Sequence, residues 1–288
     1  MSDSYFRLQL KKFSHKSRTK KFELLSVVFR PGPQDRVLDI GASGEVFLRY
    51  TFEDVYPYPE RIVAGGCELG EVLSARRLHP RPRYVLFDGC SLPFADKSFD
   101  VVFSNAVIEH VTGEGRQVEF AREIMRVGKS WFVTTPNYWF PFESHYHLPF
   151  IQFLPRPFRR EYNRLLGTHI PRGSVQELAL LSAGQLACLF PTSRIRKVRV
   201  TFWPETLVAY YIDPARHALA NVGLAPSVAV HGRANSRFPG HSRHSLVAAD
   251  ILMFGHRWLR KCGGPCAVTL GFTDDCRGLL ERPSKPAL

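Results

Sequence analysis

Three acidic residues in the first third of the chain each lie at or near the end of a short apolar run. Asp39 lies within the run Val37–Ile40, Glu68 follows a second run, and Asp88 follows Tyr84–Phe87. Runs of this length predict buried strands, and the helical spacers between them predict a parallel sheet. Because the carboxyl ends of parallel strands share one edge, we expect the three carboxyl groups to meet there and to bind one ligand.

The loop after the first strand indicates which ligand this would be. Residues 36–45 read RVLDIGASGE, a strand, a glycine loop and a helix start, as in the first βα turn of a doubly wound sheet. A dinucleotide loop requires G-x-G-x-x-G, and counting from Gly41 this chain has Ser43 and Val46 instead. The carboxylate of Asp39 would repel a diphosphate but suits an ammonium group. The loop therefore favours S-adenosylmethionine, a methyl donor, over NAD, with an ordinary turn that binds nothing as the alternative.

Three histidines are candidates for proton transfer. His110 begins a predicted helix after the fourth strand, and His145 and His147 lie in the aromatic, proline-rich segment 136–172. Histidine accepts a proton near neutral pH, and an aromatic cover excludes water from a methyl acceptor. Glu143, His145 and His147 have side chains that could hold a metal ion, although we predict no metal site. A packed loop and a packing histidine without contact to substrate remain alternatives.

The elements that must position these residues follow from hydrophobic periodicity and from glycine and proline breaks. Strands are predicted at residues 37–40, 61–67, 84–87, 99–104, 129–135, 195–202 and 206–212. Helices are predicted within residues 5–30 and at 46–52, 71–78, 119–125 and 183–190, the last with Ser182 as N-cap. This alternation predicts an α/β fold with a doubly wound, mostly parallel, Rossmann-like sheet.

Four segments together resemble a known family. VLDIGASGE, CELGE, LFDGCSLPFADKSFDVVFSNAVIEHV and WFVTTPN are similar to the class I S-adenosylmethionine-dependent methyltransferases, in the branch that acts on small molecules, lipids and glycans. The similarity runs from about Lys20 to Asp213. It implies a sheet of seven strands closed by an antiparallel hairpin. The chain departs from the family at Ser43 and Glu45, where glycines are usual.

The resemblance also implies roles for individual residues. Asp39 and Gly41 would face the methionine end of the cofactor, and Glu68 would bind the ribose hydroxyls. Asp88, Gly89 and Cys90 would contact the adenine, while Asn105 and Ala106 would lie beneath the methyl group. The implied cofactor-binding residues are Asp39, Gly41, Ala42, Gly44, Glu68, Leu69, Asp88, Gly89, Cys90, Asn105 and Ala106. Acceptor contacts are expected from Glu109, Asn137, Glu143 and Tyr146, and proton transfer from His110, His145 or His147.

Length and composition suit one domain with an appendage, since 44% of the 288 residues are hydrophobic. We predict an amphipathic helical segment at 1–30, a methyltransferase domain at 31–213 with its acceptor cap at 136–172, and an irregular, weakly structured or disordered tail at 214–288. No run of eighteen apolar residues and no secretory leader is recognised, so a cytoplasmic location is expected.

The formal charge of +13 is spread along the chain, and the only dense basic run is Lys11–Lys21. That run predicts a solvated helix face or weak contact with a membrane surface. No nucleic-acid motif accompanies it, and a nucleic-acid partner is not expected. We therefore predict an enzyme that methylates a small-molecule, glycan or lipid-linked acceptor at oxygen. The alternative is a degenerate methyltransferase fold that acts as a binding or scaffold module.

Overall fold

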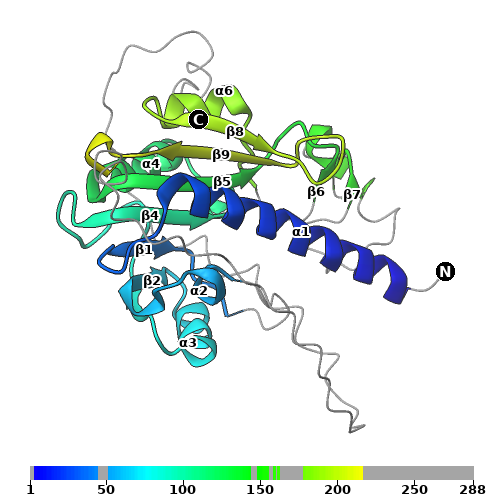
Figure 1. Cartoon of the computed structure of the whole chain (residues 1–288). Coiled ribbons are helices and arrows are strands. Elements are labelled where there is room, and N and C mark those ends of the chain that lie inside the picture. The colour runs from blue at the N-terminus through cyan, green and yellow to red at the C-terminus, as the bar shows by residue number, and fades with distance from the viewer. Residues whose placement is uncertain are drawn as a thin grey trace, which may run out of the picture.

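The computed structural model describes residues 3–44, 51–143, 148–155, 158–159, 161–162 and 178–216, with only the backbone for 3–11 and 143. Its centre is a seven-stranded sheet in the order β3-β2-β1-β4-β5-β9-β8 (Figure 1). The strands are β1 (Val37–Ile40), β2 (Ile62–Gly66), β3 (Arg83–Leu86), β4 (Phe99–Asn105), β5 (Gly128–Pro136), β8 (Arg194–Val198) and β9 (Thr206–Tyr211). Strands β1 to β5 pair in parallel, and β9 runs antiparallel to β5 and β8. The predicted α/β sheet with its closing hairpin is confirmed.

Helices cover both faces of the sheet. The apolar cluster on one face contains side chains of α1 (Asp3–Phe29), α2 (Phe52–Val55) and α3 (Leu69–Leu78). The cluster on the other face contains side chains of α4 (Arg116–Val127) and α6 (Ala183–Leu189). Side chains alternate along a strand, so Val37 joins the first cluster while Leu38 and Ile40 join the second. A sheet covered on both faces explains why β1 is buried along its whole length.

Helix α1 is one continuous helix that crosses the sheet (Figure 1). Its buried apolar residues, Phe22, Leu25 and Phe29, recur at helical spacing and are 5%, 4% and 2% exposed. Arg30 adopts φ +47°, and Pro31 follows it, which ends the helix. The predicted N-terminal segment therefore packs as part of the sheet's cover.

The remaining described elements are short. They are η1 (Pro59–Arg61), η2 (Ile108–His110), η3 (Ile151–Phe153) and the antiparallel pair β6 (Phe142–Glu143) and β7 (Leu148–Pro149). The helix predicted to begin at Val46 falls mostly outside the described residues, and α2 begins later, after Thr51. Ser182 caps α6 as predicted, since its hydroxyl accepts the Gln185 N–H at 3.3 Å. None of the described helices has the length and hydropathy that a membrane span requires.

The strand order changes direction between β1 and β4. From β1 the chain builds outward to β2 and β3, and then returns to add β4 and β5 on the other side. In such sheets the crevice for a ligand lies at the carboxyl ends of the two strands at this switch point. Ile40 pairs with Ser104, so Gly41, just after β1, lies beside Asn105, the last residue of β4. The residues that follow β1 and β4 therefore define the candidate site.

Candidate active site at the carboxyl ends of the strands

Gly41, immediately after β1, sits where no other residue fits. Its φ is +97°, a conformation that costs little only for glycine. An added Cβ would lie 2.2 Å from Cγ2 of Val107, in the loop after β4. The loops at the switch point therefore pack against each other through a glycine backbone. Among the described residues, a Cβ on Gly66, at the end of β2, would meet only the Cα of Gly41, at 3.9 Å, so no described side chain covers the backbone between β1 and β2 at this point.

The rest of the loop after β1 is held by Glu71 of α3. The carboxylate oxygen Oε2 of Glu71 accepts hydrogen bonds from Ser43 Oγ at 3.2 Å and from the Gly44 N–H at 3.0 Å. A Cβ on Gly44 would lie 2.0 Å from the Cβ of Ser74, so that glycine is required for close packing of the loop on α3. Ser43 thus has a structural partner, which sequence reasoning missed because the partner lies 28 residues away. Ala42 is buried beside them, and Glu45 lies outside the described residues.

Glu68 and Asp88 occupy equivalent places on neighbouring strands. Gly66 pairs with Leu86, and each acid lies two residues beyond that pair. Glu68 is half-buried and is the N-cap residue of α3, but its side chain makes no capping hydrogen bond. Leu69, the first residue of α3, is exposed. The structure therefore brings these two acids to the edge at which the sequence placed them.

Asp88 is fixed by its neighbours. Its Oδ1 accepts the Cys90 N–H at 2.9 Å, and its Oδ2 forms an ion pair with Arg116 of α4 at 2.7 Å. A Cβ on Gly89 would lie 2.6 Å from the Phe120 ring, so the backbone there rests directly on α4. Arg116 was not predicted from the sequence because it lies 28 residues from Asp88. These contacts fix the turn of Asp88, Gly89 and Cys90 against α4.

Asp39 lies deeper than the sequence suggested. Its partner on β2 is Ala64, four residues before Glu68. The side chain is 4% exposed and lies beside Glu53 of α2, which is 7% exposed. Burial raises the pKa of Asp39 well above its usual range, and the Glu53 carboxyl group raises it further. Strand alternation turns Asp39 toward α2, so the structure does not bring all three acids together at the edge.

The end of β4 carries a polar cluster. Asn105 Oδ1 accepts two hydrogen bonds, from Lys21 Nζ at 2.7 Å and from Thr134 Oγ1 at 2.8 Å. Ala106 follows with φ +58° and donates its N–H to the Thr134 carbonyl at 3.0 Å. The chain therefore turns sharply beside the switch point, and the Asn105 side chain is held in one orientation. Lys21 was missed because in the sequence it is one member of a basic run.

Lys21 is 7% exposed although it is a lysine on an exterior helix. Burial lowers its pKa to about 8, and nearby Arg18 lowers it too, while Glu109 and Glu205 act in the opposite direction. Glu109 is fully buried in η2, and its Oε2 accepts the Thr135 hydroxyl at 3.1 Å. Glu205 is also buried, and one of its oxygens accepts the Val200 N–H at 2.9 Å.

The other predicted acceptor residues have mixed positions. Asn137 is buried, with its amide donating to the Pro204 carbonyl at 2.9 Å and its Oδ1 accepting the Trp139 N–H at 3.2 Å. His110 is half-buried in η2, one turn beyond Ala106. Glu143 belongs to β6, but its side chain is not described. The predictions for His145, Tyr146 and His147 lie outside the described residues.

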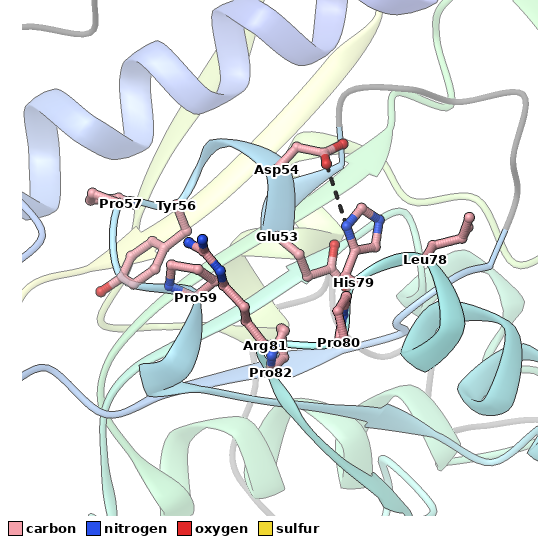
Figure 2. Close-up of a pocket in the computed structure, with 10 residues that line it drawn as sticks. All are labelled: Glu53, Asp54, Tyr56, Pro57, Pro59, Leu78, His79, Pro80, Arg81 and Pro82. Atoms are coloured by element: carbon pink, nitrogen blue, oxygen red, sulfur yellow. Dashed lines mark ion pairs between the residues drawn. The ribbon is translucent and has the colours of Figure 1, made fainter.

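A separate cavity lies near the amino ends of β2 and β3, and Figure 2 shows the residues that line it. It has a volume of about 320 Å³. Its lining residues are Glu53, Asp54, Tyr56, Pro57, Pro59, Leu78, His79, Pro80, Arg81 and Pro82. Pro59 precedes β2 and Pro82 precedes β3, so this hollow is distinct from the edge that carries Glu68 and Asp88. An ion pair of 3.3 Å between His79 and Asp54 joins the end of α3 to α2.

Comparison with known proteins identifies the domain. A family model described as a methyltransferase domain matches residues 38–131, from β1 into β5. Uncharacterized protein Rv1509 of Mycobacterium tuberculosis strain H37Rv is 36% identical over 55 residues, which is 19% of this chain and 19% of its own. Protein MT1557 of strain CDC 1551 matches equally. The match thus spans about a fifth of these relatives.

Solved structures with a similar backbone include three proteins at low identity. PH0226 of Pyrococcus horikoshii has 17% identity and a TM-score of 0.45 over 68% of this chain and 90% of its own. YcgJ of Bacillus subtilis has 18% identity and a TM-score of 0.43 over 63% and 71%. Haemonchus contortus phosphoethanolamine N-methyltransferase 2, solved with S-adenosylhomocysteine and phosphomonomethylethanolamine, has 17% identity and a TM-score of 0.44 over 62% and 39%.

The family match and the strand order agree with each other. The matched residues 38–131 contain the switch point between β1 and β4 and the loops that follow both strands. Residues 38–131 therefore match a methyltransferase domain, and the sheet that they help to build is Rossmann-like, as it is in class I, S-adenosylmethionine-dependent methyltransferases.

Proposed function

We propose that this chain binds S-adenosylmethionine at the carboxyl ends of β1 to β4 and transfers its methyl group to an oxygen of a small-molecule, glycan or lipid-linked acceptor. The observation that carries this proposal is the switch point between β1 and β4 within a domain that matches a methyltransferase model. Crevices of doubly wound sheets bind their ligands at that point. A cytoplasmic location and weak contact with a membrane surface stay predictions.

The residues at the edge suit the parts of this cofactor. Glu68, whose carboxyl group makes no helix-capping bond, has the acceptor atoms that ribose hydroxyls require. The turn of Asp88, Gly89 and Cys90, held on α4, suits the adenine. Neither Gly41 nor Gly66 has a side chain, so the cofactor can approach the backbone of both residues closely.

A bound sulfonium supplies a methyl carbon with a good leaving group. The protein's contribution is then chiefly positioning, since an oxygen held in line with the carbon–sulfur bond reacts without further activation of that carbon. In this proposal the fixed amide of Asn105 and the turn at Ala106, at the carboxyl end of β4, would lie beneath the methyl group. The acceptor hydroxyl must also lose a proton, which requires a base nearby.

The first prediction is tested by titration calorimetry with S-adenosylmethionine and S-adenosylhomocysteine. Glu68→Gln removes the charge that strengthens hydrogen bonds to ribose hydroxyls, and we expect affinity for both compounds to fall about tenfold or more. Glu60→Gln is the matched control, because Glu60 is exposed in η1 at the other end of β2. Wild-type protein that gives no heat and no melting shift with either compound would refute the proposal.

The second candidate function is a binding or scaffold module with a methyltransferase fold. The observation that favours it is the position of Glu71. Its carboxylate accepts hydrogen bonds from the Gly44 N–H and the Ser43 hydroxyl, in the loop where the family usually has glycines, so these two donors already have a partner within the protein. Binding of the cofactor without turnover on hydroxyl, amine and carboxylate acceptors would support this candidate. Methylated product from any of them would exclude it.

A further inference from the structure

Helix α1 delivers a lysine to the carboxyl ends of β4 and β5. Lys21 Nζ lies 2.7 Å from Asn105 Oδ1, across 84 residues of sequence, and Thr134 Oγ1 donates to the same oxygen. The flanking apolar residues Phe22 and Leu25 bury α1 against the sheet and fix the depth of Lys21. The lysine therefore reaches Asn105, beside the place proposed for the methyl group.

The charged groups that face Lys21 come from three elements. Arg18 precedes it by one turn on α1, Glu109 lies in η2, and Glu205 immediately precedes β9. The two carboxyl groups favour a positive charge on Lys21, whereas burial and Arg18 oppose it. Such an environment suits a group that gains and loses a proton in one catalytic cycle. The amine form still has an N–H to donate to Asn105 Oδ1.

We propose that Lys21 is the base that accepts the hydroxyl proton of the acceptor during methyl transfer, an inference that rests on the proposed function. The acceptor oxygen forms its bond to the methyl carbon as the carbon–sulfur bond breaks, and the electron pair of that bond stays on sulfur. The oxygen–hydrogen bond breaks, and the proton binds the lone pair of Nζ. One positive charge thereby moves from sulfur to Lys21, where Glu109 and Glu205 stabilise it.

The acid–base properties of Lys21 agree with this role. A pKa of about 8 leaves a useful fraction of the amine form near neutral pH, whereas an ordinary lysine would be almost wholly protonated. The geometry carries the assignment, because Lys21 makes a hydrogen bond to Asn105 at the switch point. The acceptor class that fits is a hydroxyl compound whose proton must be removed, rather than a carboxylate that carries none.

The test compares Lys21 in two complexes that differ by one methyl group and one charge. Lysine side chains labelled with ¹³C and ¹⁵N are followed by NMR from pH 6 to 10 with saturating S-adenosylmethionine or S-adenosylhomocysteine, and Lys21→Met identifies the Lys21 signal. If Lys21 lies beside the reacting oxygen, the positive charge of the sulfonium should lower the pKa of Lys21 by about one pH unit or more relative to the demethylated complex. The exposed lysines of α1 serve as internal controls.

The outcomes separate the two proposals. If both compounds bind and the pKa of Lys21 is the same in each complex, the assignment of Lys21 is overturned while the proposed function stands. If neither compound binds, the proposed function fails and the role of Lys21 fails with it. Glu205→Gln provides a second measurement: it should lower the pKa of Lys21 and leave cofactor affinity unchanged. An unchanged or higher pKa in that variant contradicts the proposal.

Discussion

Among single residues, Asp39 shows how a strand-end acid can have a structural cost. Its carboxyl group is buried and faces that of Glu53, so the ionised forms of both lack water and repel each other. Between the ordinary pKa of a carboxyl group and the raised pKa of Asp39, the folded chain binds more protons than the unfolded chain. The free energy of unfolding therefore falls as the pH rises through this window.

Asp39→Asn should remove this cost. We expect the variant to exceed wild type in unfolding free energy at pH 7 by on the order of 1 kcal/mol or more, and the difference to shrink as the pH falls toward 4. Urea unfolding at pH 5 and pH 7.5 measures the difference. Glu60→Gln, at an exposed site, is the control. A variant less stable than wild type at both pH values would contradict the prediction, and its titration with S-adenosylhomocysteine tests the predicted cofactor contact of Asp39.

Sequence reasoning located some site residues and missed others for a physical reason. Glu68 and Asp88 follow apolar runs, a local signal that also states which edge of the sheet they reach. Lys21, Glu71 and Arg116 act through partners that lie 84, 27 and 28 residues away, and no local pattern reports such contacts. Lys21 in particular has basic neighbours and differs from them only in burial, which depends on how α1 rotates against the sheet.

Among the elements, the loop after β1 has the strictest requirement for backbone geometry. Gly41→Ala would place a methyl group 2.2 Å from Val107 at φ +97°, and Val107 has no flexible side chain that could move aside. We expect the variant to lose about 2 kcal/mol or more of unfolding free energy. Gly70→Ala is the matched control: in the described part of the chain no atom lies within 4 Å of the Cβ that it would add. Because Gly70 is a residue of α3, we expect this variant to be as stable as wild type or more stable by up to about 1 kcal/mol.

Thermal and urea unfolding of both variants provide the measurement. Equal stability of Gly41→Ala and Gly70→Ala would show that the two loops at the switch point can separate without cost. That result would contradict the close packing from which we derive the shape of the site.

Element boundaries followed from the sequence where the signals were local. Proline and glycine breaks and β-branched runs placed six of the seven strands close to their observed bounds, as with β5 at Gly128–Pro136 against the predicted 129–135. The exception is β8, which ends at Val198 and not at the predicted residue 202. The helix predicted after β4 is a single 3-10 turn, Ile108–His110. Gly113 and Gly115 follow it with positive φ, a backbone conformation that does not continue a helix. The β6–β7 pair was not predicted, because two-residue strands have no periodicity.

At the level of the whole molecule, Arg216 joins the end of the described chain to the segment between α1 and β1. Its guanidinium group donates to the Phe29 carbonyl at 2.8 Å and to both oxygens of Asp35, at 2.9 and 2.5 Å. Its side chain is 18% exposed and that of Asp35 is 16% exposed. A two-pronged pair with this little exposure is stronger than a surface salt bridge.

Arg216→Ala leaves Asp35 and a carbonyl without this partner, and we expect a loss of roughly 1–3 kcal/mol in unfolding free energy. Arg216→Lys keeps the charge but not the planar fork, so it should recover only part of the loss. Urea unfolding of the three proteins at pH 7 gives the comparison. If Arg216→Lys has the same free energy of unfolding as wild type, the charge alone accounts for the stabilisation. If Arg216→Ala has the same free energy of unfolding as wild type, the contact contributes nothing to stability.

This contact has a consequence for how the chain folds during synthesis. Asp35 leaves the ribosome 181 residues before Arg216 does, and β9, whose Val208 and Tyr210 pack in the same apolar cluster as α1, also emerges late. The apolar face of α1 therefore stays exposed to solvent while most of the sheet is still being translated. A nascent chain of this protein should be a client of ribosome-associated chaperones until its last strands have emerged.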